Sequence, residues 1–128
     1  HPGSLYAHCC RFMIVSSTTQ VYIAIGSADM RKSINGLSSL VASDYSLNPL
    51  TGNFFVFSNK SRSIVKILYW HINGYCLWQK RLEKGRFIWP ESRDDVLQVG
   101  QRELSWLLEG LDVHQAKAHK RLEYSRAY

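Results

Sequence analysis

The chain has 128 residues, of which 45% are hydrophobic and 12% aromatic, and its formal net charge is +6. This length supports one hydrophobic core and leaves no room for a second domain of ordinary size. No apolar run approaches the roughly 18 residues of a membrane-spanning helix, which excludes a helical membrane protein, and the basic balance predicts an acidic partner.

The N-terminal segment predicts neither secretion nor metal binding. Cys9, Cys10 and Cys76 form no C-x-x-C pair and no even secreted-type framework, so we expect no zinc site, no structural disulfide and a reducing cytoplasm. The first residues lack the features of a signal peptide, and Met13 is the first methionine. We therefore expect residues 1–12 to be a poorly ordered extension, translated upstream or appended, without a role in function.

The first patterned segment predicts a strand that leads into a helix. Residues 21–25 are β-prone and end at Gly26, and Ser27 and Asp29 can both start a helix. Apolar side chains then recur at helical spacing and form one stripe, which predicts an amphipathic helix: Met30, Ile34, Leu37 and Val41.

The middle of the chain predicts three strands. Turn chemistry at residues 48–52 precedes a compact aromatic run at 54–57, which predicts a buried strand. Two further β-prone runs, residues 64–71 and 75–83, flank Asn73-Gly74, the strongest short signal for a hairpin turn. These runs are expected to form the middle of an antiparallel sheet.

The C-terminal part predicts a short strand at residues 96–99 followed by a helix. The helix carries leucines at i, i+3, i+4 and i+7, and Gly110 is placed to close it: Leu104, Leu107, Leu108 and Leu111. From Val113 onward the sequence is polar, basic and unpatterned. The fold predicted is one α+β domain spanning residues 13–112, an antiparallel β-sheet with a central hairpin packed by two amphipathic helices, with residues 113–128 as a basic tail.

A two-residue Asn73-Gly74 turn would set the register of the hairpin. Tyr69 would then face Trp78, and Lys66 would face Arg81. One hairpin face would be the more apolar, with Val65, Ile67, Tyr69, Trp78 and Leu82. Like charges directly across a strand pair repel, so Lys66 and Arg81 predict a phosphate between them, unless Glu83 neutralises them without a ligand.

Several motifs occur in the order and spacing of one family. They are Asp29-Met30-Arg31-Lys32 with Gly36-Leu37, Pro49 with Gly52, Phe55-Val56-Phe57, Lys66-Ile67-Leu68 with Trp70, Gly74 and Leu77, Lys80-Arg81-Leu82-Glu83-x-Gly85-Arg86-Phe87-x-Trp89-Pro90, and Leu107-Leu108-Glu109-Gly110-x-Asp112. The chain resembles, over about residues 21–112, the TnpB accessory proteins of the insertion-sequence-66 family. It departs from the family pattern at His71, where an acid is common, and at Asn48, where Asp is usual.

The resemblance implies a supporting role in DNA transposition. A separate, larger transposase would carry the catalytic carboxylates. Other elements encode RNA-guided nucleases that share the name TnpB. This chain does not resemble those nucleases, because it is too short and lacks their zinc-ligand cysteines.

Charge along the chain points to the same region as the densest motif. From residue 60 to residue 86 there are seven cations and one anion, so this stretch carries the whole net charge of +6. Cations of this kind attract phosphates, and the interleaved aromatics Tyr69, Trp70, Tyr75 and Trp78 could stack on bases, although such aromatics are usually core. The predicted nucleic-acid-binding residues are Arg31, Lys32, Lys60, Arg62, Lys66, Lys80, Arg81, Lys84 and Arg86.

The sequence does not predict catalysis. Asp29 is most simply a carboxylate favourable to a helix N-terminus, Asp94-Asp95 lies in a loop, and no carboxylate trio has the spacing of a metal site. His114 and His119 fall in the predicted tail, and no glycine loop is suited to cradling phosphates. We expect no catalytic residues, no metal, no cofactor and no small-molecule substrate.

The function predicted is that of a noncatalytic accessory protein of insertion-sequence transposition, acting in the bacterial cytoplasm and nucleoid-associated if DNA-bound. Its expected partners are transposon DNA, bound through the basic hairpin, and the transposase of the same element, with no membrane partner. The main alternative is a module that docks on the transposase without touching DNA. A small nuclease and an RNA-binding protein are further alternatives.

Overall fold

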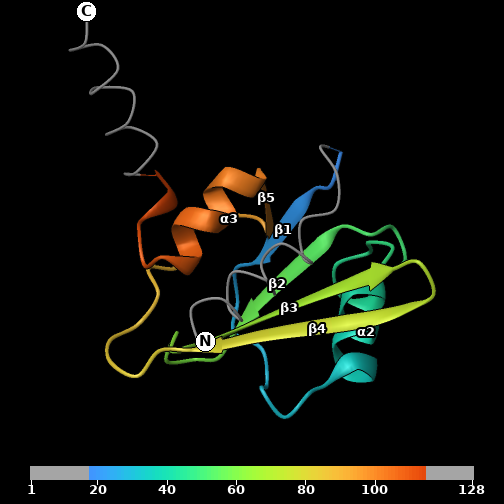
Figure 1. The fold of residues 1–128 in the computed structure, drawn as a ribbon, viewed down its shortest axis with the longest axis horizontal. Helices are drawn as coiled ribbons and strands as arrows, with labels where there is room; N and C mark the ends of the chain where they lie inside the picture. The colour runs from blue at the N-terminus through green and yellow to red at the C-terminus, as the bar shows by residue number, and fades with distance from the viewer. Residues whose placement is uncertain (1–17, 115–128) are drawn as a thin grey trace, which may run out of the picture.

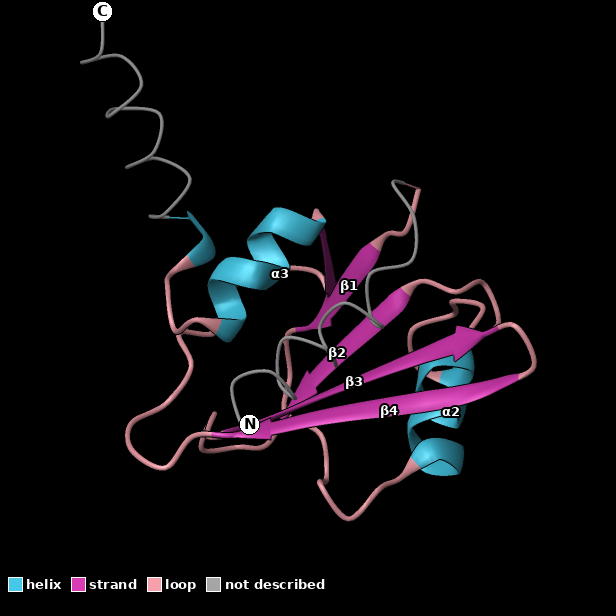
Figure 2. Cartoon of the chain, viewed as in Figure 1, coloured by secondary structure: helices cyan, strands magenta, loops and turns pink. Residues whose placement is uncertain are grey.

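The computed structural model describes residues 18–114 and shows one mixed sheet with a helix on each face (Figure 1). The expectations for residues 1–12 and for most of the basic tail lie outside the described residues. The elements, coloured by type in Figure 2, are β1 (Val21–Ala24), α2 (Ile34–Ser43), β2 (Phe54–Ser58), β3 (Ile64–His71), β4 (Gly74–Arg81), β5 (Val96–Val99) and α3 (Gln101–Leu108).

The sheet has five strands in the order β4-β3-β2-β1-β5 and is not wholly antiparallel. β1 and β2 pair in parallel, with Val21 beside Phe54, whereas the other neighbours are antiparallel. The parallel pair follows from α2, because a helix between two strands carries the chain back to the end where the first strand began. The prediction of an antiparallel sheet was therefore wrong for this pair, and the prediction of a central hairpin was wrong too, because β4 is an edge strand.

The aromatic run of β2 is buried because both faces of the sheet are covered. Phe54 and Val56 belong to the core cluster that includes the leucines of α3, and Phe55 and Phe57 belong to the cluster that includes Leu37 of α2. Successive side chains of a strand point to opposite faces. A continuous apolar run is thus the expected pattern for a strand between two layers, as the sequence predicted.

α3 follows the predicted leucine pattern. Leu104, Leu107 and Leu108 are buried, and Gly110 adopts φ +89° just past the helix end, a conformation that glycine takes without steric cost. Leu111 lies off the buried stripe and is 44% exposed. Val113, assigned to the tail by sequence, is buried against the same cluster, so the described part of the core includes a residue of the predicted tail.

α2 begins later than Ser27 or Asp29 would place it. Its first residue is Ile34 and its N-cap position is Ser33. Asp29 instead makes a local turn, since its carboxylate accepts the backbone N–H and the guanidinium N–H groups of Arg31. Met30 packs on the α2 side of the sheet from this turn, so the predicted apolar stripe is correct in space although its first residue is not helical.

The β3–β4 hairpin turns one residue earlier than predicted. His71 pairs with Gly74, and the two turn residues are Ile72 and Asn73. The pairing therefore shifts by two residues: Lys66 faces Gln79 rather than Arg81, and Ile67 faces Trp78. Because side chains alternate with a period of two, this shift leaves each side chain on its predicted face, and the apolar face does lie on the α3 side.

No helix of the described residues is long and apolar enough to cross a membrane.

Ile72 is a strained residue that contributes little packing. It adopts φ +57° and its side chain is 81% exposed. Left-handed backbone costs an L-residue about 1–2 kcal/mol, and replacement by glycine removes this cost. Glycine is also freer in the unfolded state, which lowers the resulting gain in stability by roughly 0.5–1 kcal/mol. Ile72→Gly should raise the free energy of unfolding by about 0.5–1 kcal/mol in urea denaturation. Ile72→Val keeps the branched Cβ and should not stabilise, and equal gains from both variants would contradict this explanation.

Candidate nucleic-acid interface

Three loops meet at one end of the sheet. β1 and β2 end there because they are parallel, and antiparallel pairing brings the start of β3, the end of β4 and the start of β5 to the same end (Figure 1). Backbone hydrogen bonds join the loops: Ala28 N–H donates to Ser58 O at 2.8 Å, and Phe87 N–H donates to Arg62 O at 2.7 Å. We call residues 25–33, 59–63 and 81–95 the basic end.

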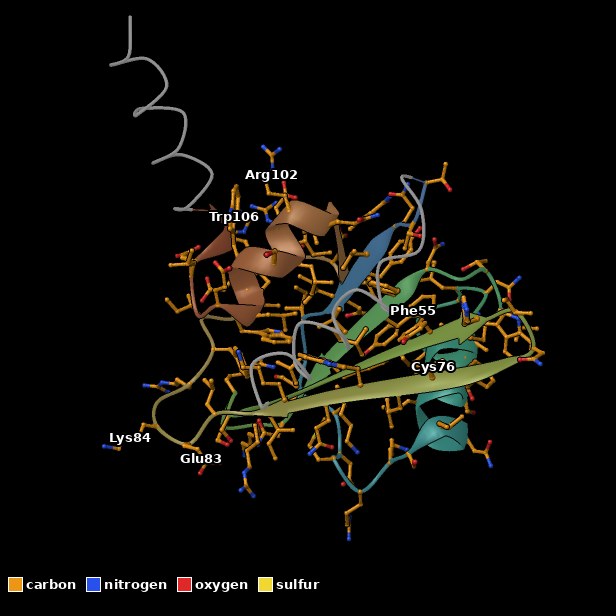
Figure 3. The ribbon with its side chains drawn as sticks, in the orientation of Figure 1. Phe55, Cys76, Glu83, Lys84, Arg102 and Trp106 are labelled. Atoms are coloured by element: carbon orange, nitrogen blue, oxygen red, sulfur yellow. The ribbon has the colours of Figure 1, made fainter. Side chains whose placement is uncertain are left out.

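The positive charge of the described chain gathers at this end. Every Lys and Arg among residues 18–114 except Arg102 lies in these loops or, as Lys66 and Lys80 do, close to a strand end that enters them. The loops at the opposite end, residues 44–53 and 72–73, contain neither Lys nor Arg. Arg102 stands apart on α3 (Figure 3). The fold thus brings together cations that are up to sixty-odd positions apart, from Arg31 to Arg93.

Four of the predicted binding residues are exposed and uncommitted. The side chains of Lys32, Lys60, Lys84 and Arg86 make no hydrogen bond or ion pair among the described residues. They come from all three loops, and Lys84 projects from the loop after β4 (Figure 3). Arg93 is exposed on the same loop and was missed by the sequence reasoning, because it stands beside Asp94 and Asp95 and outside the cationic run.

Two further candidates are paired with carboxylates at the surface. The Arg31 guanidinium lies 2.7 Å from the Asp29 carboxylate, and its hydrogen bonds lower the pKa of Asp29 from 3.8 to about 2. Arg81 and Glu83 are 3.5 Å apart and largely exposed. Exposed pairs of this kind contribute little to stability, so a phosphate can compete with either carboxylate. From the sequence, Glu83 was the group that could neutralise Lys66 and Arg81 in place of a phosphate. In the structure Glu83 pairs with Arg81.

Lys66 belongs to the interior. Only 8% of it is exposed, and its Nζ donates to Met30 O at 2.8 Å and to Lys32 O at 3.0 Å. These carbonyls lie in the loop that precedes α2. The predicted phosphate between Lys66 and Arg81 therefore has no structural basis, because the two are not opposed and the ammonium is engaged inside the protein. Lys66 positions the loop that carries Lys32.

Arg62 and Lys80 also hold the loops in place. The Arg62 guanidinium donates to Ser58 Oγ at 2.6 Å and to Ile25 O at 2.9 Å, and it lies 5.1 Å from the ring centroid of Trp89. Burial lowers its pKa from the ordinary value, although an arginine remains charged. Lys80 Nζ donates to Leu108 O at 2.9 Å, which satisfies a carbonyl at the C-terminal end of α3.

Most aromatics that the sequence proposed for base stacking pack on the protein. Tyr69 is 7% exposed and its ring lies 5.0 Å from Phe54, and Trp70 and Tyr75 form an edge-to-face pair at 5.1 Å. Trp78 packs against the α3-side core. The basic end has two aromatics, the buried Phe87 and the partly buried Trp89, whose indole N–H donates to Ala24 O at 2.9 Å. Its place beside Arg62 could not be inferred from sequence, since the two are far apart in the chain.

Metal-ligand chemistry is not assembled in residues 18–114, where no group of three or more His, Cys, Asp or Glu side chains is suited to holding a metal ion. Cys76 is a half-buried free thiol in β4. The remaining candidates from the sequence, Cys9, Cys10 and His119, lie outside the described residues.

Comparison with known proteins identifies relatives along nearly all of the described chain. A family model described as IS66 Orf2 like protein matches residues 19–118. The chain is 41% identical over 93 residues to the uncharacterized protein y4hO of Sinorhizobium fredii, covering 73% of this chain and 81% of the relative. It is 37% identical over 93 residues to the uncharacterized protein y4jC of the same organism, covering 73% and 80%. No solved structure matches the chain.

The structural role of Lys66 leads to a stability prediction. Lys66→Met keeps the length of the side chain but leaves the Met30 and Lys32 carbonyls without their donor, which should lower the free energy of unfolding by about 1–3 kcal/mol. Urea denaturation measures this change. The matched variant, Lys84→Met, removes an exposed cation with no partner among residues 18–114 and should stay within about 0.5 kcal/mol of the parent. A stable Lys66→Met protein would show that the two hydrogen bonds do not hold the loop.

The Asp29–Arg31 pair leads to a pH prediction. The folded-state pKa of Asp29, about 2, lies below its ordinary value of 3.8. The pair therefore stabilises the fold above pH 3.8, and this contribution is lost as the pH falls toward 2. An NMR titration of the Asp29 carboxyl should show the low pKa, and Arg31→Ala should move it back toward 3.8. An unchanged pKa in Arg31→Ala would refute the assigned cause.

Proposed function

Because the chain belongs to the IS66 Orf2-like family, we propose that it is a noncatalytic accessory protein of insertion-sequence transposition that binds element DNA through the basic end. The observation that supports DNA contact is the convergence of exposed cations from three separate loops on one end of the sheet. Loops that meet at one end of a rigid scaffold are a common place for binding residues.

The uncommitted cations make the first contacts with DNA. Lys32, Lys60, Lys84, Arg86 and Arg93 are exposed, so a phosphate reaches them without breaking a protein interaction. Each phosphate that is neutralised releases condensed counterions, which makes such binding favourable and salt-dependent. Binding of this kind positions the protein on the backbone and carries little sequence information by itself.

Arg31 and Arg81 add to this surface by exchanging partners. Each is exposed and paired with a neighbouring carboxylate, Asp29 or Glu83. A phosphate that replaces the carboxylate offers the guanidinium a bidentate partner of the same geometry. The carboxylate is then free to return to water, so the exchange costs little.

The cations whose side chains bond to the protein contribute indirectly. Lys66, Arg62 and Lys80 hold the loop before α2, the β2–β3 turn and the C-terminal end of α3. A loop already fixed in the free protein loses less conformational entropy when it binds. We therefore limit the proposed contacts with the phosphates of duplex DNA to the exposed members of the predicted set, together with Arg93.

The chain acts beside the transposase of its element, to which the proposal assigns the chemistry of strand transfer. The family model and the resemblance of the motifs support this division, and both curated relatives are uncharacterized. In a cell the protein is expected on the nucleoid while it is bound to DNA. The competing proposal is a module that docks on the transposase alone.

A pair of single arginine variants tests the DNA contact. Arg86→Ala and Arg102→Ala each remove one exposed arginine, but only Arg86 lies at the basic end. Arg86→Ala should weaken binding to an element-end duplex in fluorescence anisotropy and reduce the slope of log affinity against log salt by about 0.9. Arg102→Ala should change neither. The triple variant Lys60→Ala, Lys84→Ala, Arg86→Ala should reduce the slope by roughly 2–3.

Two outcomes would count against the proposal. Equal losses for Arg86→Ala and Arg102→Ala would show that net charge acts rather than the basic end. Folded protein that ignores DNA at low salt but co-purifies with the transposase would replace the proposal with the docking module. Competition between DNA and RNA of one sequence decides between the two nucleic acids.

A further inference from the structure

A pocket of about 650 Å³ opens at the basic end beyond the carboxyl end of β1. Ile25, which directly follows β1, forms one part of its wall, and the β2–β3 turn contributes Arg62. The loop after β4 supplies the remainder, residues 86–92. At this end β1 leads into α2, and the loop after β4 enters β5, the antiparallel neighbour of β1. The volume of the pocket is in the range of small-ligand sites.

The wall of the pocket combines a flat surface with positive charge. The Arg62 guanidinium lies over the Trp89 ring, 5.1 Å from the centroid, and we call these two planar groups, one above the other, the Arg62–Trp89 layer. Ile88 adds an apolar side chain that is 46% exposed, and Arg86 adds an exposed guanidinium with no partner among residues 18–114. Glu91 is the one carboxylate in the wall and can accept a hydrogen bond from an N–H group of a base.

The planar layer is fixed before any ligand arrives. Arg62 adopts φ +60°, a conformation that a residue with a Cβ keeps only when its surroundings enforce it. Here the Asn59 side chain accepts hydrogen bonds from the N–H groups of Ser63 and Ile64, and Arg62 O accepts one from Phe87 N–H. Trp89 is held by its bond to Ala24 O. A guanidinium has five N–H donors and only two are used in these contacts, so donors remain for an anion.

We propose that this pocket binds a single unpaired nucleotide of the element DNA, with the base against the Arg62–Trp89 layer and a phosphate on Arg86. The inference rests on the proposed function and specifies the form of its DNA ligand. A paired base is stacked inside the duplex and cannot enter a pocket, whereas an unpaired base exposes its flat face. The planar and apolar groups of the wall suit the flat, apolar face of a base, and its cationic group suits the phosphate of the same nucleotide.

Three DNAs of one sequence test the base contact in fluorescence anisotropy: a blunt duplex, the duplex with a single-stranded thymidine overhang, and the duplex with an overhang of abasic sites. The abasic overhang keeps the phosphates and lacks the bases. The thymidine overhang should bind about tenfold more tightly than the abasic overhang, which is within the range of base–aromatic stacking. Equal binding of the two overhangs would overturn the inference.

Pocket variants locate the contact. Ser92→Leu places bulk in the wall, and Ser105→Leu adds the same bulk to an exposed position of α3. Should Ser92→Leu impair folding, Ile88→Glu puts a carboxylate at an exposed position of the wall, matched by Leu50→Glu, at a position 52% exposed at the other end. Each pocket variant should abolish the preference for thymidine over abasic overhangs, and each control should retain it. A preference that survives in Ser92→Leu and Ile88→Glu would refute the pocket as the site.

The same measurements separate the inference from the proposed function. Tight, salt-dependent binding of the blunt duplex with no preference for bases would leave the proposed function standing and refute the pocket. Failure of all three DNAs to bind at low salt would refute both.

Discussion

The parallel pairing of β1 and β2 is the constraint on which the functional surface depends. α2 carries the chain back across one face, so both strands end at the same edge of the sheet, and the antiparallel partners then bring their own loops to that edge. An all-antiparallel arrangement of the same strands would send the β1 and β2 loops to opposite ends and divide the cations between them. The charge asymmetry of the molecule therefore depends on topology, which brings the loops that contain Lys and Arg to one end, while the loops at the other end, residues 44–53 and 72–73, contain neither.

Cations serve two physical roles at this end, and burial separates them. Lys66 is buried and its ammonium donates to two backbone carbonyls, and the partly buried Arg62 donates to Ser58 Oγ and Ile25 O. A buried charge must be matched in this way because an unmatched one is very costly. Lys60, Lys84 and Arg86 keep their hydration and remain available to phosphates. From the sequence, both groups were assigned to DNA binding, because the residue type alone does not show whether the ammonium of a lysine near a strand end points into the protein or into solvent.

The sequence predicted what is local and failed on what depends on long-range pairing. The aromatic run of β2 and the leucines of α3 were assigned correctly because burial on two faces or on one helical stripe leaves a direct periodic pattern. The faces of the hairpin were also correct, since a shift of two residues preserves alternation even though Ile72 and Asn73 form the turn. Strand order was not predictable in this way: nothing near β1 in the sequence indicates that it lies between β2 and β5. The Arg62–Trp89 contact has the same origin, because it joins two loops that only the sheet brings together.

The two parts of the proposed interface differ in range, and this difference assigns them different tasks. Exposed cations act over about a Debye length, roughly 8 Å at physiological ionic strength, and attract any nucleic acid without regard to its bases. The pocket as proposed acts only at contact, where a free base would reach the Arg62–Trp89 layer and a paired base would not. A protein with the cations alone would bind duplex DNA anywhere, and one with the pocket alone would find its ligand slowly. Together, under the two proposals, they would direct the protein to DNA that is locally opened, which is the form that strand cleavage and joining at an element end would produce.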